Sequence, residues 1–263
     1  MGKRCLICLA LAAAVAALVS TPIGIDGASG EQTQRGALVS SLKGELRPLA
    51  LPRDRLAPIA IHLEGGLRTA DRSLLPRVTK LEIGLPGQGA LSTRGLPTCP
   101  PRRLRATKTA EALGACRRAL VGRGRLDAVV ALRNQAPFLV RARLLAFNSR
   151  VGGHRAVLLH AGAGNPPTSS VLPLRVQPGS GRFGTALVGR VDAALGQWPR
   201  LRRFAITLYR RYAYRGSRRS YLSASCPVPP ALPAAFFSFA RTSYTLADGA
   251  HIALAIGRSC RAR

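Results

Sequence analysis

Acidic residues are scarce in this chain: 11 Asp and Glu accompany 40 Lys and Arg, which leaves a formal net charge of +29. Enzymes need positioned acid, base or nucleophilic groups, and the chain offers few carboxylates and four histidines. No G-x-S-x-G nucleophile elbow is present. This scarcity disfavours catalysis, although the fold could still assemble a hydrolytic site from Asp127, Asp192 and Asp248.

Metal-binding and phosphate-loop motifs are also missing. There is no C-x-x-C pair, and the four histidines do not cluster, so we predict neither a metal site nor a cofactor. Two glycine-rich segments, 122–124 and 162–165, superficially resemble phosphate loops. Neither precedes a predicted helix that could present backbone amides to a phosphate, so both are interpreted as turns.

Lysine is nearly absent, and the basic residues are almost all arginine. This bias, together with much Ala, Gly, Pro and Leu, is typical of a GC-rich coding sequence, so part of the charge reflects base composition. A surface this positive nevertheless attracts polyanions through long-range forces that salt screens. The four lysines are Lys3, Lys43, Lys80 and Lys108.

Residues 1–29 have the features of a secretory signal. Two basic residues precede an apolar run over residues 5–19, and small residues at 27–29 offer a cleavage site. Residues 5–25 carry no charge and are also long enough for an uncleaved membrane anchor. Either alternative predicts that the body of the protein is secreted or extracytoplasmic.

The exported part keeps an even number of cysteines, which in an oxidising compartment favours two disulfides over a zinc site. Three pairings are open. We favour the pairing that keeps each bridge within its own half of the chain, which joins Cys99 to Cys116 and Cys226 to Cys260.

Short segments of alternating polarity predict a mainly β fold of sandwich or barrel-like domains. One helix is expected to begin near Thr107 and to turn Cys116 inward. Tight turns, such as Asp248-Gly249, separate the later strands. The expected strands cover residues 59–64, 81–85, 126–132, 138–147, 156–161, 183–191, 236–246 and 251–256.

A constant offset of 123 residues aligns Pro76–Leu85 with Pro199–Leu208, and this predicts two related domains in tandem. The alternative is chance agreement within a biased composition. The resulting map has a flexible tether at 30–56, a first domain at 57–164, a linker at 165–170 and a second domain at 171–263.

The segment 199–227 combines arginines and tyrosines without any acidic residue. It predicts a β-hairpin with strands at 204–209 and 220–225, and guanidinium groups near tyrosines suit phosphate or carboxylate recognition. The plainer alternative is a solvated face whose arginines blunt a sheet edge. The predicted contact residues are Arg210, Arg211, Arg215, Arg218, Arg219, Tyr212, Tyr214 and Tyr221.

Several segments, TRGLPTC, ALGACRRALVGRGR, LLAFNSR, GRFGTAL, YRGSRRSYLSASCP, TLADGAHIAL and SCRAR, together resemble an uncharacterised family of secreted proteins from GC-rich actinobacteria. The resemblance covers residues 56–263. It implies an exported, four-cysteine domain pair, and it implies no activity and no site residue.

These observations predict a non-catalytic protein of the cell envelope that binds an acidic polymer or anionic lipid head groups through the hairpin. Nucleic acid is expected only as a nonspecific ligand, because export and disulfides accompany no nucleic-acid-binding signature. The alternatives are a secreted hydrolase acting on a cell-wall component and a purely structural envelope protein.

Overall fold

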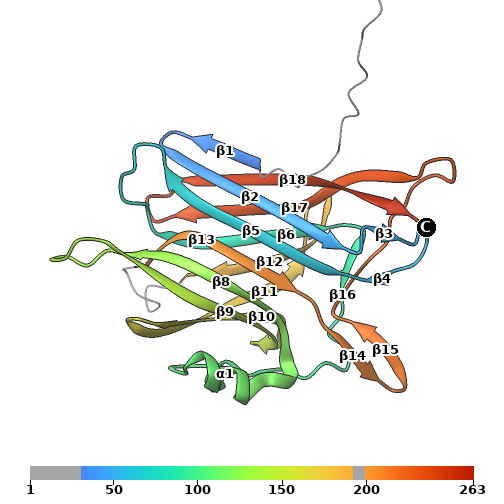
Figure 1. The fold of residues 1–263 in the computed structure, drawn as a ribbon, viewed down its shortest axis with the longest axis horizontal. Coiled ribbons are helices and arrows are strands. Elements are labelled where there is room, and N and C mark those ends of the chain that lie inside the picture. The colour runs from blue at the N-terminus through green and yellow to red at the C-terminus, as the bar shows by residue number, and fades with distance from the viewer. Residues whose placement is uncertain (1–30, 192–198) are drawn as a thin grey trace, which may run out of the picture.

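The computed structural model describes residues 31–191 and 199–263, which fold mainly as β-strands (Figure 1). Within these ranges there is one α-helix, α1 (Thr109–Cys116), with the short 3-10 helices η1 (Pro101–Arg103) and η2 (Arg117–Ala119) beside it. The prediction of a mainly β fold with one short helix is confirmed. The predicted signal segment lies outside the described residues.

Most strands are long and follow one another closely. Their bounds are β1 (Glu31–Arg35), β2 (Leu38–Arg47), β3 (Ala50–Leu51), β4 (Ala57–Pro58), β5 (Ala60–Thr69), β6 (Val78–Pro86), β7 (Gly89–Leu91), β8 (Leu120–Val130), β9 (Phe138–Val151), β10 (His154–Gly164), β11 (Pro167–Pro178), β12 (Phe183–Arg190), β13 (Pro199–Leu208), β14 (Arg211–Tyr214), β15 (Ser217–Ser220), β16 (Leu222–Ala224), β17 (Ala234–Leu246) and β18 (His251–Ala262).

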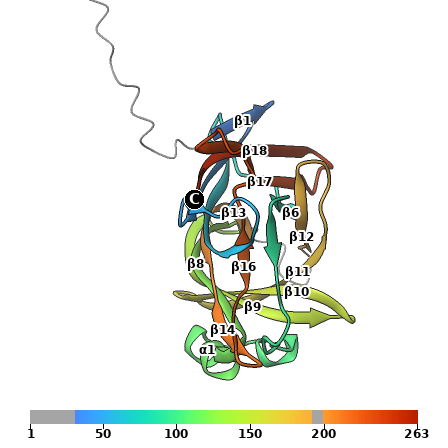
Figure 2. The same ribbon diagram turned by 90° about the vertical axis from the view of Figure 1, so that its right-hand side faces the viewer.

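One large sheet organises the described chain, in the order β1-β2-β5-β13-β8-β9-β10-β11-β12-β6-β17-β18-β3. Its neighbours are antiparallel except for β18 and β3, which are parallel. Figure 2 shows how the sheet curls, with β8 on one side, β9 and β10 below, β11 and β12 opposite, and β17 and β18 above. Strand twist makes a wide sheet curl, and here the curl encloses its apolar face.

The two ends of the curled sheet meet through side chains. Arg258 on β18 donates from Nε to the Gly44 carbonyl on β2 over 2.6 Å, and its Nη1 lies 3.8 Å from the Glu31 carboxylate on β1. A Cβ at Gly44 would overlap the Phe239 ring of β17. Glycine at this position therefore lets β2 pack closely over the opposite end of the sheet.

Residues 30–56 differ from the expected flexible tether, because most of them form β1, β2 and β3. Leu42 and Leu46 of β2 are buried in the main core. The inward positions beside them are occupied by Ser40 and Gly44, which are too small to reveal an apolar alternation in the sequence.

The strands of the two predicted domains alternate within one sheet. β13 lies between β5 and β8, and β6 lies between β12 and β17. Residues 165–170, expected as a linker, instead form the turn after β10 and the first residues of β11. The predicted domain map differs from the structure because apolar alternation identifies strands but does not identify which strands pair with each other. The duplication itself stays a prediction.

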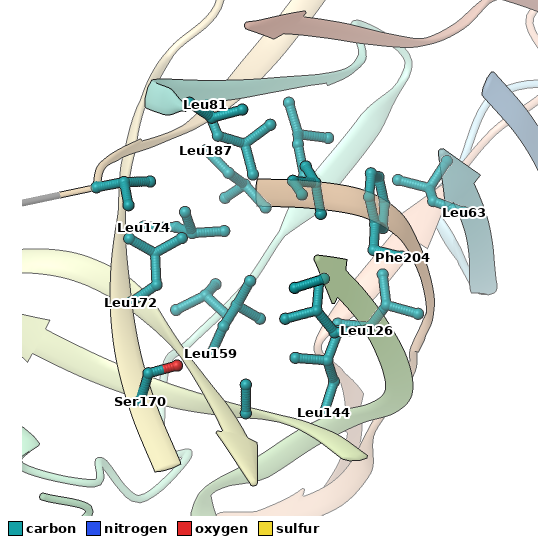
Figure 3. Close-up of a pocket in the computed structure, with 18 of the residues that line it drawn as sticks. Leu63, Leu81, Leu126, Leu144, Leu159, Ser170, Leu172, Leu174, Leu187 and Phe204 are labelled. Carbon is teal, nitrogen blue, oxygen red and sulfur yellow. The ribbon is translucent and has the colours of Figure 1, made fainter. Parts of the chain in front are cut away.

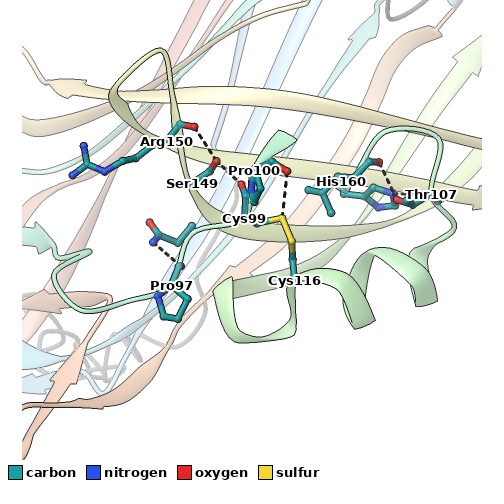
Figure 4. The surroundings of a disulfide bond; sticks show 10 residues. Pro97, Cys99, Pro100, Thr107, Cys116, Ser149, Arg150 and His160 are labelled. Carbon is teal, nitrogen blue, oxygen red and sulfur yellow. Dashed lines mark hydrogen bonds between the residues drawn. A yellow bond between two sulfur atoms is a disulfide. The ribbon is translucent and has the colours of Figure 1, made fainter. Parts of the chain in front are cut away.

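Both expected disulfides are present, Cys99–Cys116 and Cys226–Cys260, with Cα–Cα distances of 5.5 and 5.9 Å. The first joins α1 to the segment before η1, and Figure 4 shows the helix lying beside the sheet there. A second, smaller core lies beneath α1 and contains Leu104, Phe147 and Leu158. The predicted start of the helix and the inward position of Cys116 are confirmed.

The two disulfides should stabilise the protein unequally. They close loops with sequence separations of 17 and 34 residues. In the chain-entropy model, replacing Cys99 and Cys116 by alanine lowers the free energy of unfolding by about 3 kcal/mol, and replacing Cys226 and Cys260 lowers it by about 4 kcal/mol. Urea unfolding of the two double variants measures both values, and equal unfolding midpoints for wild type and variants would contradict the expectation.

Candidate functional site

The predicted hairpin is present but shorter than expected. Its strands are β14 and β15, and its turn is formed by Arg215 and Gly216, with φ of 50° and 72°. Two positive φ values are typical of a type I′ hairpin turn. β13, expected as the first strand of the hairpin, instead pairs with β5 and β8 in the main sheet.

The hairpin tyrosines support a neighbouring loop. Tyr212 donates from its hydroxyl to the Arg94 carbonyl over 2.8 Å. The Tyr214 ring covers Gly95, whose φ is +78° and where a Cβ would overlap the ring. Both side chains are half-buried. They therefore hold the chain between β7 and η1 in place.

The hairpin arginines are mostly exposed. Arg215 and Arg219 place their guanidinium carbons 5.4 and 5.8 Å from the centre of the Tyr214 ring. Arg211 and Arg218 are exposed on the hairpin as well. Of the five ion pairs found among the described residues, none involves these four arginines. The hairpin is thus a concentrated, unneutralised positive surface.

Two predicted contact residues do not fit that surface. Tyr221 is 0% exposed, so it cannot meet a ligand at the surface. Arg210 is half-buried, its Nε is enclosed without a partner, and its carbonyl accepts from the Tyr221 amide over 2.8 Å. The reason is the path of the chain: after β15 it turns inward to β16, which pairs with β4 and β7.

Three of the four histidines have structural partners, and His154 is exposed at the start of β10. His62 Nδ1 lies 2.9 Å from the Thr207 hydroxyl, and His251 Nε2 lies 2.7 Å from the Ser243 hydroxyl. His160 is fully buried beside α1, where its Nε2 lies 2.9 Å from the carbonyl oxygen of Thr107 (Figure 4). Within the described ranges, no three His, Cys, Asp or Glu residues form a group that could hold a metal ion.

The three candidate carboxylates are not assembled into a described site. Asp127 on β8 lies in register between Arg203 of β13 and Arg141 of β9. Asp248 accepts the Ala250 amide over 3.0 Å in the turn between β17 and β18. Asp192 lies outside the described residues.

An apolar cavity lies inside the curl of the sheet (Figure 3). Its volume is about 170 Å³, and eight strands line it: β5, β6, β8, β9, β10, β11, β12 and β13. Ser170 contributes the one hydroxyl among the lining side chains, and the others are aliphatic or, at Phe204, aromatic. The strand alternation was visible in the sequence, but the space between the strands was not.

Local sequence explains the apolar lining of each wall. On β10, Leu159 and Ala161 face the cavity, and on β11, Ser170 and Leu172 do so, because alternate residues of a strand share a face. Leu159 and Leu172 are only partly buried. The inner face of the sheet is therefore incompletely packed at this place.

Two arginines adjoin the cavity lining. Arg77 precedes Val78, and Arg200 lies between Pro199 and Leu201, all three of which line the cavity. Burial lowers the pKa of the Arg200 guanidinium, and the positive charge of Arg77 lowers it further. Arg200 lies between two lining residues of one strand, so its side chain points to the opposite face of β13, away from the lining.

Comparisons with known proteins add no relative: no family model, no curated protein and no solved structure matches this chain. The resemblance to a secreted actinobacterial family stays a prediction. None of the helices in the described ranges has the length and apolar character needed to cross a membrane.

The two fully buried tyrosines should titrate abnormally. Burial raises the pKa of the Tyr221 and Tyr244 phenols, and for Tyr221 the charge of Arg155 offsets part of the rise. An unfolded tyrosine ionises near pH ~10. Both phenols have a higher pKa in the folded state than in the unfolded state. The stability that they contribute is therefore fully present below pH ~10 and is lost as the pH rises through their folded-state pKa.

We therefore expect two of the five tyrosines to ionise only as tertiary structure is lost, measured by tyrosinate absorbance alongside near-ultraviolet circular dichroism. Tyr221→Phe and Tyr244→Phe should each remove one late-ionising group. Ionisation of all five tyrosines with the dichroism unchanged would show that the burial is wrong.

Proposed function

We propose that this protein is an exported, non-catalytic binding protein of the cell envelope whose apolar cavity holds a hydrocarbon group. The observation that carries the proposal is the cavity of about 170 Å³ with an almost wholly apolar lining. An engineered apolar cavity of about 150 Å³ binds benzene. The cavity is thus suited to a ring of that size or a short stretch of an acyl chain.

The chemistry of the lining supports an apolar occupant. A hydrocarbon would contact the aliphatic side chains, whereas a polar ligand would lose its hydrogen bonds to water and find only the Ser170 hydroxyl.

Two further observations support export. The two disulfides are compatible with an extracytoplasmic protein, and the signal-like segment 1–29 supports export.

Filling the cavity should abolish binding of a small amphiphile. Octanoate and 1-octanol titrated into the purified, oxidised protein should both bind, because both offer the same hydrocarbon chain to the apolar lining. Ala161→Phe places a ring in the cavity and should weaken octanoate binding at least roughly tenfold. Ala253→Phe, at an exposed position of β18, is the matched control and should bind as wild type does.

Calorimetry measures all four affinities, and the melting temperature of each variant confirms folding. Octanoate binding that is equal in wild type and Ala161→Phe would locate the ligand outside the cavity. Absence of binding of either compound to wild type would refute the hydrocarbon ligand.

A second candidate function is attachment to an acidic envelope polymer or anionic lipid surface through the hairpin. The exposed hairpin arginines, which form no ion pair with a carboxylate of residues 31–191 or 199–263, favour it. The plainer alternative is a solvated basic edge. It has the same geometry, but it predicts that an anionic surface binds the hairpin no more tightly than other exposed arginines.

A charge-matched pair of variants separates these alternatives. The hairpin variant replaces four arginines by glutamine, and a control variant replaces four exposed arginines of β8 and β9, so both lose the same charge. Attachment through the hairpin predicts that only the first loses binding to anionic vesicles or wall polymer at about 0.15 M salt. Equal losses, or binding to vesicles, polymer and DNA alike that disappears with salt, would identify generic attraction. The hairpin set is Arg211, Arg215, Arg218 and Arg219, and the control set is Arg123, Arg125, Arg141 and Arg143.

A further inference from the structure

A second hollow, here called the arginine pocket, lies next to the hairpin and has a volume of about 510 Å³. Its walls are the segment from Leu91 to Leu96 with Thr98, and the ends of β9 and β10 at Asn148–Arg150 and Arg155. Unlike the apolar cavity, most of its lining is polar. It contains three arginines and no carboxylate.

The charges of the pocket are concentrated by the register of the sheet. Arg150 and Arg155 are directly opposite each other in the β9–β10 ladder, and like charges at opposed positions destabilise a sheet. Arg94 adds a third guanidinium from the facing loop. The ion pairs found among the described residues include none of these three side chains. A bound anion would offset their repulsion.

Two of these arginines are positioned yet keep free donors. Arg155 donates from Nη1 to the Leu91 carbonyl over 3.3 Å, and Arg150 donates from Nη1 to the Gly153 carbonyl over 3.0 Å. A guanidinium has five N–H donors, so most remain for a ligand. The hydroxyls of Ser92, Thr93 and Thr98 lie in the same lining and add neutral donors.

The loop that carries Arg94 is fixed on its inner side to β9. The Cys99 amide donates to the Asn148 carbonyl over 2.8 Å, and the Ser149 hydroxyl donates to the Cys99 carbonyl over 2.7 Å. The Asn148 side-chain amide donates to the Pro97 carbonyl over 3.0 Å. Figure 4 shows Ser149 and Pro97 beside the Cys99–Cys116 disulfide.

On the outer side, Tyr212 and Tyr214 hold the same loop at Arg94 and Gly95. The pocket is therefore preorganised from both sides, which lowers the entropic cost of binding a ligand.

We propose that the arginine pocket binds a phosphate ester through Arg94, Arg150 and Arg155. Planar guanidinium groups donate pairs of hydrogen bonds to phosphate oxygens, and three of them match a group with several anionic oxygens better than a single carboxylate. The volume leaves room for the alcohol part of the ester.

The pocket adjoins the apolar cavity on one face of the β9–β10 ladder. Asn148, which lines the pocket, is the register partner of Val157, which lines the cavity. The ester could therefore come from a lipid head group or from a small soluble phosphate ester. The lipid source rests on the proposed function; the phosphate site does not.

Three probes test the site by calorimetry at about 0.15 M salt: inorganic phosphate, glycerol 3-phosphate and a soluble short-chain phosphatidylglycerol. Wild type should bind glycerol 3-phosphate, and Arg150→Gln with Arg155→Gln should weaken this binding at least roughly tenfold. The matched control is Arg125→Gln with Arg143→Gln, another directly opposed and exposed pair in the same sheet, outside the pocket. It removes the same charge and should bind as wild type does.

Because Arg150 and Arg155 repel each other, the variant that lacks both should be at least as stable to heat as wild type when no ligand is present. Addition of glycerol 3-phosphate should stabilise only wild type and the control variant. Failure of wild type to bind all three probes, or equal weakening in both double variants, overturns the phosphate site.

The lipid arm identifies the source. Phosphatidylglycerol that binds more tightly than glycerol 3-phosphate, with the gain lost in Ala161→Phe, supports a lipid head group. Equal affinities support a soluble phosphate ester. Because Ala161→Phe leaves the arginine pocket intact, a failed hydrocarbon site and a failed phosphate site give different patterns of binding.

Discussion

The apolar face of one wide antiparallel sheet has to be removed from water, and the rest of the molecule follows from that requirement. Few helices are available to cover it, so the sheet curls until its two ends face each other (Figure 2). Arg258 bridges those ends by binding the Gly44 carbonyl and approaching Glu31. A curl that closes in this way packs tightly at Phe239 and less tightly farther along, where the apolar cavity remains.

The shortage of carboxylates changes what the arginines do. Arg35, Arg53, Arg150, Arg155 and Arg258 donate to backbone carbonyls, and Arg53 alone donates to the carbonyls of Val228, Pro229, Pro230 and Leu232. A guanidinium with five donors can hold a loop in this way. Part of the positive charge is thus used structurally.

The hairpin illustrates the limit of interpreting one segment by itself. Its arginines and tyrosines were expected to form a single contact surface, but the tyrosines support the loop of Arg94 and Gly95 and Tyr221 is in the core. The arginine pocket was missed because Arg94 is far in sequence from Arg150 and Arg155. One signal was present: Arg150 and Arg155 flank Gly152-Gly153, and a tight hairpin there would oppose them.

The sequence by itself determined the mainly β class and the position of α1, because alternation and helical periodicity are properties of short stretches of chain. It left three disulfide pairings open, and the favoured one, Cys99–Cys116 with Cys226–Cys260, is confirmed by the structure. Only the tertiary structure decided that β13 lies between β5 and β8, that residues 31–51 belong to the sheet, and that a cavity and an arginine pocket share one face of β9 and β10. The physical reason is that a strand's pattern states which side is buried, whereas its neighbours are selected by the packing of the whole sheet.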